Sequence, residues 1–361
     1  MEDWKECKLS DIADVTMGQS PESIYYNSNK EGMPFLQGNR TFGYKFPTFD
    51  TYTTFVTKVA QKEDVIMSVR APVGELNIAP EKLCLGRGVC SIRMKNNEQM
   101  FLYYLMKANR KQLLNKENGT VFGSVNRNDI ANLTIHLPPL PTQQKIAQIL
   151  SSLDDKIELN NKINANLEQQ AQALFKSWFV DFEPFGGEMP AGWKVGKLSE
   201  IAEITSGKRP PMKQLDLSKD VQIPLVGAAS VMGYTNSVLY NEPILITGRV
   251  GTHGVIQRFN TECWPSDNTL VVKSHYYEYT YQIMCNIDYS NMNRGSTQPL
   301  ITQSDLGKVE CLIPAGNELE KFEKLVNILF NKIDANLEEN KKLSNLRDTL
   351  LPKLMNGEVE I

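Results

Sequence analysis

The most constraining feature of this 361-residue sequence is an internal repeat. The stretch WKECKLSDIADVTMGQSP at residues 4–21 returns as WKVGKLSEIAEITSGKRP at residues 193–210, with the tryptophan, the glycine and the final proline at the same places. Two copies of one sequence predict two copies of one folded unit. The chain therefore has to be explained as a duplicated structure.

The similarity between the two copies continues along the chain at a falling offset. The further matched pairs are 33–44 with 223–234 (offset 190), 63–70 with 242–249 (offset 179), and 118–140 with 294–316 (offset 176). The second pair places Arg70 opposite Arg249 and is followed by Cys84 opposite Cys263. Loops tolerate such changes in length better than strands and helices do. The whole chain thus consists of two copies of one structural unit.

Length and composition agree with two cores. A chain of 361 residues with 41% hydrophobic and 22% charged residues is long for a single core. It has no uninterrupted run of about 18 apolar residues, and its first ten residues lack the pattern of a signal peptide, so we expect a cytoplasmic protein. The six cysteines and three histidines are widely spaced, so no metal site or disulfide framework is predicted.

Each copy contains two kinds of sequence. Short β-branched and aromatic runs separated by Gly, Pro and Asn predict a mixed α/β globule, and a long polar segment with regular apolar residues predicts a helix. We therefore predict an α+β fold, in which two pseudo-symmetric mixed α/β domains are separated by two long helices packed as an antiparallel coiled coil. The predicted boundaries are a first globule at 1–140, a helix at 141–180, a linker at 181–192, a second globule at 193–316, a helix at 317–355 and a tail at 356–361.

The two long segments carry the same seam at an offset of 176. Its residues are Ile146, Leu150, Leu153, Ile157, Asn160, Asn164, Leu167, Ala171 and Leu174, matched by Phe322, Val326, Leu329, Ile333, Asn336, Asn340, Leu343, Arg347 and Leu350. Spacings that alternate between four and three are typical of a coiled coil, with each helix roughly 55–60 Å long. If the helices are antiparallel, the four asparagines meet near the centre and fix the register. An exposed polar patch is the alternative interpretation of these asparagines.

Two helical segments and the repeated opening carry a resemblance to a known family. The stretch LPPLPTQQKIAQILSSLDDKIELNNKINANLEQQAQALFKSWFVDFEPF at 137–185 and the stretch NLRDTLLPKLMNGEVEI at 345–361 resemble the central and distal conserved regions of type I restriction–modification specificity subunits. The openings at Trp4 and Trp193 resemble the start of their target recognition domains. The resemblance covers essentially the whole chain, and some members carry a further conserved segment before this opening.

The resemblance implies a function in DNA recognition. Each globule would bind one half of a split, asymmetric target in double-stranded DNA. The helices would space the halves and dock two methyltransferase subunits. Those partners would bind S-adenosylmethionine and methylate adenine, and two further ATP-driven restriction and translocation subunits would complete the complex. This chain would then need no cofactor of its own.

The sequence shows no catalytic site of its own. It lacks the (N/D)PP(Y/F) motif of adenine methyltransferases and the GxxxxGK(S/T) phosphate loop, and GRVGTHG at 248–254 lacks the spacing of a dinucleotide loop. The polar residues of the two copies also differ, which argues against a duplicated enzyme. A protein-binding scaffold with two heads remains the alternative function, and the net charge of −3 slightly favours it.

Candidate DNA-contact residues come from the polar loops of the globules, because Arg, Lys, Asn, Gln and Ser read base edges in the major groove. They are Arg40, Arg70, Arg87, Asn126 and Arg127 in the first globule, and Lys208, Arg209, Arg249, Arg294, Ser296 and Gln298 in the second. The recurrence of Arg70 and Arg249 in both copies suits phosphate positioning or a structural ion pair better than base reading. For any single cation, a solvated surface position is an equally good interpretation.

The first long segment ends in the aromatic cluster FKSWFVDF. Exposed at a helix end, Trp178 and Phe179 would form an anchor for a partner protein. Packing against the neighbouring globule is the alternative.

Overall fold

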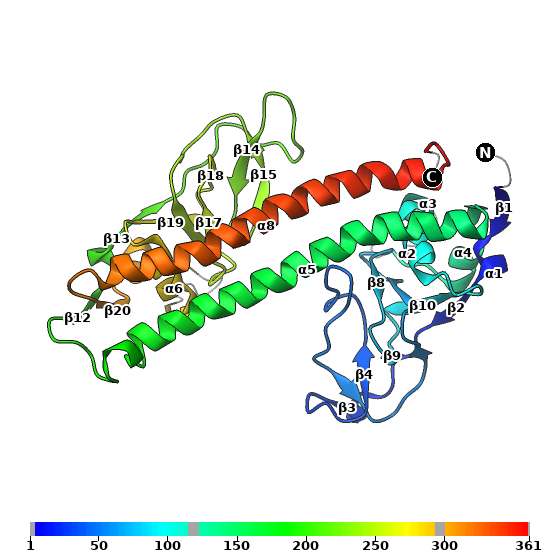
Figure 1. The fold of residues 1–361 in the computed structure, drawn as a ribbon, viewed down its shortest axis with the longest axis horizontal. Coiled ribbons are helices and arrows are strands. Elements are labelled where there is room, and N and C mark those ends of the chain that lie inside the picture. Colours follow the sequence, from blue (N-terminus) through cyan, green and yellow to red (C-terminus); the bar gives the residue numbers. More distant parts are fainter. Residues whose placement is uncertain (1–3, 115–122, 293–299, 360–361) are drawn as a thin grey trace. The chain divides into compact units, whose positions relative to one another are not determined.

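The computed structural model describes residues 4–114, 123–292 and 300–359 and consists of two compact units (Figure 1). Unit 1 comprises Met1–Lys162 with Ala335–Ile361, and unit 2 comprises Ile163–Asp334. Two long helices, α5 (Leu140–Phe179) and α8 (Glu318–Met355), contribute one part to each unit. None of the helices in the described ranges is long and apolar enough to cross a lipid bilayer.

Unit 1 is built around a four-stranded antiparallel sheet. In spatial order its strands are β2 (Ala13–Met17), β10 (Val89–Met94), β7 (Val65–Ser68) and β8 (Leu76–Ile78). All four residues of β7 are buried, as expected for a central strand covered on both faces. The sheet, α2 (Gln99–Ala108) and the first part of α5 enclose one hydrophobic core.

Smaller elements complete unit 1. β1 (Lys5–Lys8) pairs with β11 (Thr134–Leu137), and the short helices are α1 (Leu9–Ile12), η1 (Ser23–Tyr25), α3 (Arg110–Leu114) and α4 (Arg127–Ala131). A second, mixed sheet has the order β3 (Tyr26–Asn27), β5 (Tyr52–Thr53), β4 (Met33–Leu36), β9 (Leu83–Leu85) and β6 (Val59–Ala60).

Unit 2 repeats this plan. Its four-stranded sheet has the order β13 (Ala202–Ser206), β19 (Thr269–Ser274), β16 (Ile244–Gly248) and β17 (Gln257–Phe259), and β12 (Lys194–Lys197) pairs with β20 (Glu310–Ile313). The second sheet has the order β15 (Val231–Thr235), β14 (Ile223–Val226) and β18 (Trp264–Pro265). The remaining elements are η2 (Glu183–Phe185), η3 (Leu198–Glu200), α6 (Tyr277–Cys285), η4 (Tyr289–Met292) and α7 (Gln303–Gly307).

The glycine that recurs in the repeat has the same cause in both units. A Cβ atom on Gly18 would lie 2.1 Å from the carbonyl oxygen of Gly86, and one on Gly207 would lie 2.2 Å from the carbonyl oxygen of Ser266. Real Cβ atoms do not approach a backbone oxygen so closely, so only glycine lets the chain pass here. The repeat therefore preserves a backbone crossing.

Strand pairing corrects one part of the sequence alignment. Ile66 pairs with Ser91, and Ile246 pairs with Val271, so this region corresponds at an offset of 180 and not 179. The position equivalent to Arg70 is Val250, since Arg70 bridges Ser124 and Val250 bridges Leu300. A shift of one residue turns a strand side chain to the opposite face. The matches of Arg70 with Arg249 and of Cys84 with Cys263 were therefore wrong.

The two long helices pack against each other in antiparallel direction within each unit. In unit 1, Asp154 of α5 contacts Arg347 of α8, and six residues further along α5 Asn160 contacts Asn340, seven residues earlier in α8. In unit 2, Phe175 and Trp178 of α5 contact Phe322 of α8. Every residue of the predicted seam is buried or half-buried. The coiled-coil prediction is confirmed.

Candidate functional site

Three of the predicted arginines line one hollow on unit 1. Arg40, Arg70 and Arg87 surround a cavity of about 470 Å³. The other residues of its wall are Phe35, Gln37, Gly38, Asn39, Thr41, Asp50, Thr51, Ala71 and Gly88. Guanidinium groups bind phosphate or guanine, and amides and hydroxyls bind base edges. The hollow thus combines the donors and acceptors that a nucleic acid requires.

Different elements bring these arginines together. Arg70 follows β7, Arg87 lies between β9 and β10 with its main-chain N–H donating to Ser20 Oγ at 3.0 Å, and Arg40 lies in the loop between β4 and β5. Arg40 forms an ion pair with Asp50 at 2.7 Å, and its hydrogen bond lowers the pKa of Asp50. Because both side chains are exposed, this pair contributes little to stability. Loss of this ion pair would therefore cost unit 1 little stability.

Asn126 has a structural task in unit 1. It is the N-cap of α4, and its Oδ1 accepts hydrogen bonds from the main-chain N–H groups of Asn128 (2.8 Å) and Asp129 (3.1 Å). Thr302 caps α7 of unit 2, where its Oγ1 accepts a hydrogen bond from the main-chain N–H of Asp305 at 3.1 Å. These capping hydrogen bonds satisfy the side-chain oxygen of Asn126, so its position is explained without a bound ligand. Arg127, the first residue of α4, is exposed.

The candidates of unit 2 that belong to the described residues lie at two places. Lys208 and Arg209 are exposed just after β13, where the carbonyl of Lys208 accepts a hydrogen bond from Trp264 Nε1 at 2.8 Å. Arg249 is half-buried, and its main chain bonds to Asn268 and Ile301. Three further candidates lie outside the described residues, namely Arg294, Ser296 and Gln298.

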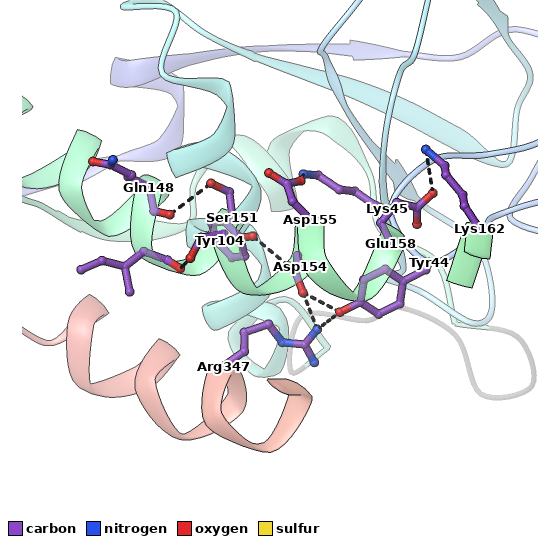
Figure 2. Close-up of polar contacts among 12 residues, drawn as sticks. Tyr44, Lys45, Tyr104, Gln148, Ser151, Asp154, Asp155, Glu158, Lys162 and Arg347 are labelled. Atoms are coloured by element: carbon purple, nitrogen blue, oxygen red, sulfur yellow. Dashed lines mark hydrogen bonds and ion pairs between the residues drawn. The ribbon is translucent and has the colours of Figure 1, made fainter. Parts of the chain in front are cut away.

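A polar network, buried except at Tyr44, which is 36% exposed, joins the globule of unit 1 to both long helices (Figure 2). Asp154 of α5 is 1% exposed and accepts hydrogen bonds from Tyr44 (2.5 Å), Tyr104 (2.8 Å) and Arg347 Nη1 (2.7 Å). Arg347 of α8, 7% exposed, also donates to the hydroxyl of Tyr44 and to Asp348. A buried carboxylate and a buried guanidinium are stable only when paired in this way.

The electrostatics of the network follow from its hydrogen bonds. Burial alone would raise the pKa of Asp154, but hydrogen bonds from Tyr44 and Arg347 outweigh it and hold this pKa below its usual range. Burial and the neighbouring Asp154 carboxylate raise the pKa values of Tyr44 and Tyr104. Asp154 is therefore ionised and both tyrosines are neutral near pH 7.

Unit 2 uses another arginine where its globule meets the helices. Arg258 of β17 forms a two-pronged ion pair with Glu278 of α6, whose side chain is 5% exposed. The Arg258 guanidinium lies 3.6 Å from the ring centroid of Phe330 on α8, and 5.0 Å from those of Tyr277 and Tyr281. Cation–π contact and a carboxylate partner together allow this burial.

Sequence reasoning missed most of these residues. Arg347 belongs to the predicted seam, and a charge at an apolar position is a signal that could have identified the network. Nothing in the sequence near Tyr44, Asp154 or Arg258 marks them.

The proposed aromatic anchor is corrected for one of its two residues. Phe179 is 5% exposed and belongs to the core of unit 2, with its ring 4.9 Å from Phe322 and 5.8 Å from Trp193. It cannot serve as an exposed anchor, because its surface is already covered. Trp178 is half-buried at the edge of the same cluster, so its partner-binding role stays a prediction.

The four seam asparagines are all buried, with exposed fractions of 1% for Asn160, 7% for Asn164, 1% for Asn336 and 9% for Asn340. In unit 1, Asn160 Nδ2 donates to Asn340 Oδ1 at 2.9 Å. An exposed polar patch is therefore excluded. Their effect on register stays a prediction.

Comparisons with known proteins agree along the whole chain. The sequence model of the family described as "Type I restriction modification DNA specificity domain" matches residues 1–169 and 190–346. The chain is 28% identical to the MjaIX specificity subunit of Methanocaldococcus jannaschii (99% of this chain, 94% of the relative) and 26% identical to the HindI specificity subunit of Haemophilus influenzae (99% and 100%). The crystal structure of an S subunit from M. genitalium has the same fold, with a TM-score of 0.63 at 18% identity over 98% of this chain and 96% of that one.

Proposed function

Because this chain belongs to the type I restriction–modification DNA specificity family, we propose that each of its two units reads one half of a split, asymmetric target in double-stranded DNA. The chain is a specificity subunit with two target recognition domains and is itself non-catalytic. The family's cofactors reside on its partners, so S-adenosylmethionine and ATP are assigned to the methyltransferase and restriction subunits.

One observation carries the proposal of two different half-sites. The four-stranded sheets of the two units have the same order of strands, yet residues at equivalent positions differ: half-buried Val250 stands where exposed Arg70 lies, and Gln303 of α7 stands where Arg127 of α4 lies. A common frame with different surface donors suits two readers of different sequences. Identical surfaces would instead suit a palindromic target.

The proposed organisation assigns a task to each segment. Residues 1–140 and 193–316 are the two target recognition domains, joined to the helices at 141–180 and 317–355 through the linker 181–192, with a tail at 356–361. The helices keep the half-sites at a fixed spacing and dock two methyltransferase subunits, with Trp178 as a contact. The buried asparagines hold the register on which this spacing depends.

Mapping methylated adenines in a host that carries this chain and its methyltransferase tests the proposal directly. A bipartite motif is the expected result. Duplex binding by the purified complex should weaken steeply as salt rises, because phosphate contacts release counterions. Binding that ignores DNA sequence and salt would instead support a protein-binding scaffold.

Arg127→Ala assigns the first unit to its half-site. We expect binding of the target to weaken by about 1–3 kcal/mol and discrimination to relax at one base position. The matched variant in unit 2 is Gln303→Ala, which should affect only the other half-site. An equal loss on every DNA sequence would place Arg127 on the phosphates.

A further inference from the structure

The loop between β4 and β5 of unit 1 connects the hollow to the long helices. Residues 37–51 form this loop, and its two ends supply Gln37, Asn39, Arg40, Thr41, Asp50 and Thr51 to the wall of the hollow. Between the ends, the main-chain N–H of Thr48 donates to the carbonyl of Thr41 at 2.9 Å. This hydrogen bond joins the two arms of the loop between its tip and its ends.

The tip of the loop is a turn closed by the hydrogen bond from the N–H of Gly43 to the carbonyl of Phe46 at 3.1 Å. Asn77 of β8, 1% exposed, holds the turn to the globule by bonding both the N–H and the carbonyl of Gly43. The two residues inside the turn, Tyr44 and Lys45, point to α5 (Figure 2). The tip is thus fixed from the globule on one side and from the helices on the other.

Both tip residues bind consecutive acids of α5. Tyr44 donates to Asp154 and accepts from Arg347, and Lys45 forms an ion pair with Asp155. The hydrophobic core attaches the globule to α5 at Ile146 and Leu150. The polar contacts lie one to two turns further along α5 than this apolar attachment, at 1.5 Å per residue. Two separate attachments fix the orientation of the globule of unit 1 on α5, whereas a single attachment would leave this orientation variable.

We propose that Tyr44, Asp154 and Arg347 form a positioning network that holds the 37–51 loop, and with it the Arg40 side of the hollow, in the geometry that reads the first half-site. The inference rests on the proposed function, since it assigns the hollow to DNA. Arg347 does not line the hollow; it acts through the hydroxyl of Tyr44 and the carboxylate of Asp154. A preorganised loop binds more tightly and more selectively because it loses less conformational entropy on binding.

Within the described residues, unit 2 has no counterpart of this turn between the corresponding strands. Tyr234 pairs with Pro224 as Tyr52 pairs with Pro34, so strand pairing makes Tyr234 the equivalent of Tyr52 and not of Tyr44. Only residues 227–230 connect β14 to β15, whereas residues 37–51 connect β4 to β5. The network belongs to unit 1, and a defect in it should disturb one half-site.

Two matched variants separate positioning from stability. Tyr44→Phe removes the hydroxyl that holds the loop, while Asp154 keeps Arg347 and Tyr104 as partners. Tyr104→Phe removes another hydroxyl from the same carboxylate, but Tyr104 belongs to α2 and is fully buried in the core. Both are tested in the complex with methyltransferase subunits, on duplexes that carry the mapped target or a single base change in either half. The free chain is examined by amide hydrogen exchange.

Tyr44→Phe should speed amide exchange at residues 41–48 and reduce discrimination in the half-site read by unit 1 about tenfold, or about 1.4 kcal/mol. Discrimination in the other half-site should not change. Tyr104→Phe should lower the melting temperature more than Tyr44→Phe and leave discrimination intact. Equal effects on both half-sites, or unchanged exchange in Tyr44→Phe, would overturn the network's role. Loss of all half-site discrimination in the wild-type complex would contradict the proposed function, and the exchange experiment would still test the loop.

Discussion

The two units differ in which element supplies the buried charge where the globule packs against the long helices. At the offset of 176 that relates the helices, Asp154 corresponds to Phe330 and Arg347 corresponds to Ala171. Unit 1 therefore buries an ion pair whose two residues both belong to the long helices. Unit 2 has a phenyl ring and a methyl group at these positions, and its buried cation, Arg258, belongs to the globule. The duplicated frame fixes where a globule meets a helix. It does not fix which side supplies the charge.

The largest expected effect comes from breaking the ion pair of unit 1. Arg347→Met leaves Asp154 buried with only two tyrosine hydroxyls, which should destabilise unit 1 by about 3–5 kcal/mol. Hydrogen exchange of unit 1 peptides measures the loss, with unit 2 peptides as the internal control. The double variant Asp154→Leu/Arg347→Met removes both charges and should recover most of the stability. A double variant as unstable as the single one would mean that the pair itself is net stabilising.

Arg258→Met tests the other solution. It leaves Glu278 buried without its partner, but methionine keeps an apolar contact with Phe330, so we expect a smaller loss of about 2–3 kcal/mol, confined to unit 2. Arg258→Lys is the matched control: it keeps the charge and loses the two-pronged geometry and the stacking. Its effect should lie between that of Met and the wild type. If lysine were as harmful as methionine, the stacking and not the charge would hold this junction.

The shared frame can be tested with the recurring glycine. Gly18→Ala and Gly207→Ala each place a Cβ atom against a carbonyl oxygen and should each cost about 1–3 kcal/mol, in unit 1 and unit 2 respectively. Thermal unfolding of the two variants should give similar shifts. Gly38→Ala is the control, because a Cβ atom there meets no atom within 4 Å. Clearly unequal losses would show that the two backbone crossings are not equivalent.

The smallest expected effect is a difference in pH dependence. Burial raises the pKa of Glu323 in unit 2 from 4.5 to about 7, so the folded state holds a proton that the unfolded state releases in this range. The free energy of unfolding of unit 2 should therefore fall as pH rises from 4.5 to 7, with a slope of at most one proton. The lowered pKa of Asp154 acts in the opposite sense on unit 1, whose stability should be lost as pH falls below about 4.

Glu323→Gln isolates this contribution. The slope of unit 2 between pH 4.5 and 7 should flatten, while unit 1 serves as the unchanged reference in the same urea titration. A slope that persists in the variant would assign the proton to another group.

The architecture was predictable from the sequence because it depends on periodic features. The repeat predicts the doubled order of strands, and the seam predicts which helix residues are buried, Asn160 and Asn340 included. The alignment was wrong by one residue at Arg70, because it matched two identical arginines. The pairing of strands gives the correct match, and only the structure shows that pairing. Registers of this kind depend on hydrogen bonds between distant segments.

The junctions could not be predicted, because their partners are remote in sequence. Tyr44 and Asp154 are 110 residues apart, and Arg347 is 193 residues from Asp154. No local pattern connects them. The candidate site was predicted as a set of cations, and the hollow that unites three of them depends on loops whose course no periodicity describes.

The division of the long helices between the units has a consequence for how the protein is made. Unit 2 is one continuous stretch, Ile163–Asp334, whereas unit 1 requires Ala335–Ile361 to return to a globule that begins near the amino terminus. Leu351, Leu354 and Met355 are buried in the core of unit 1. During synthesis, unit 1 has all of its own sequence only after Ala335–Ile361 has left the ribosome, and closing so long a loop is slow. The globule translated first is therefore the one completed last.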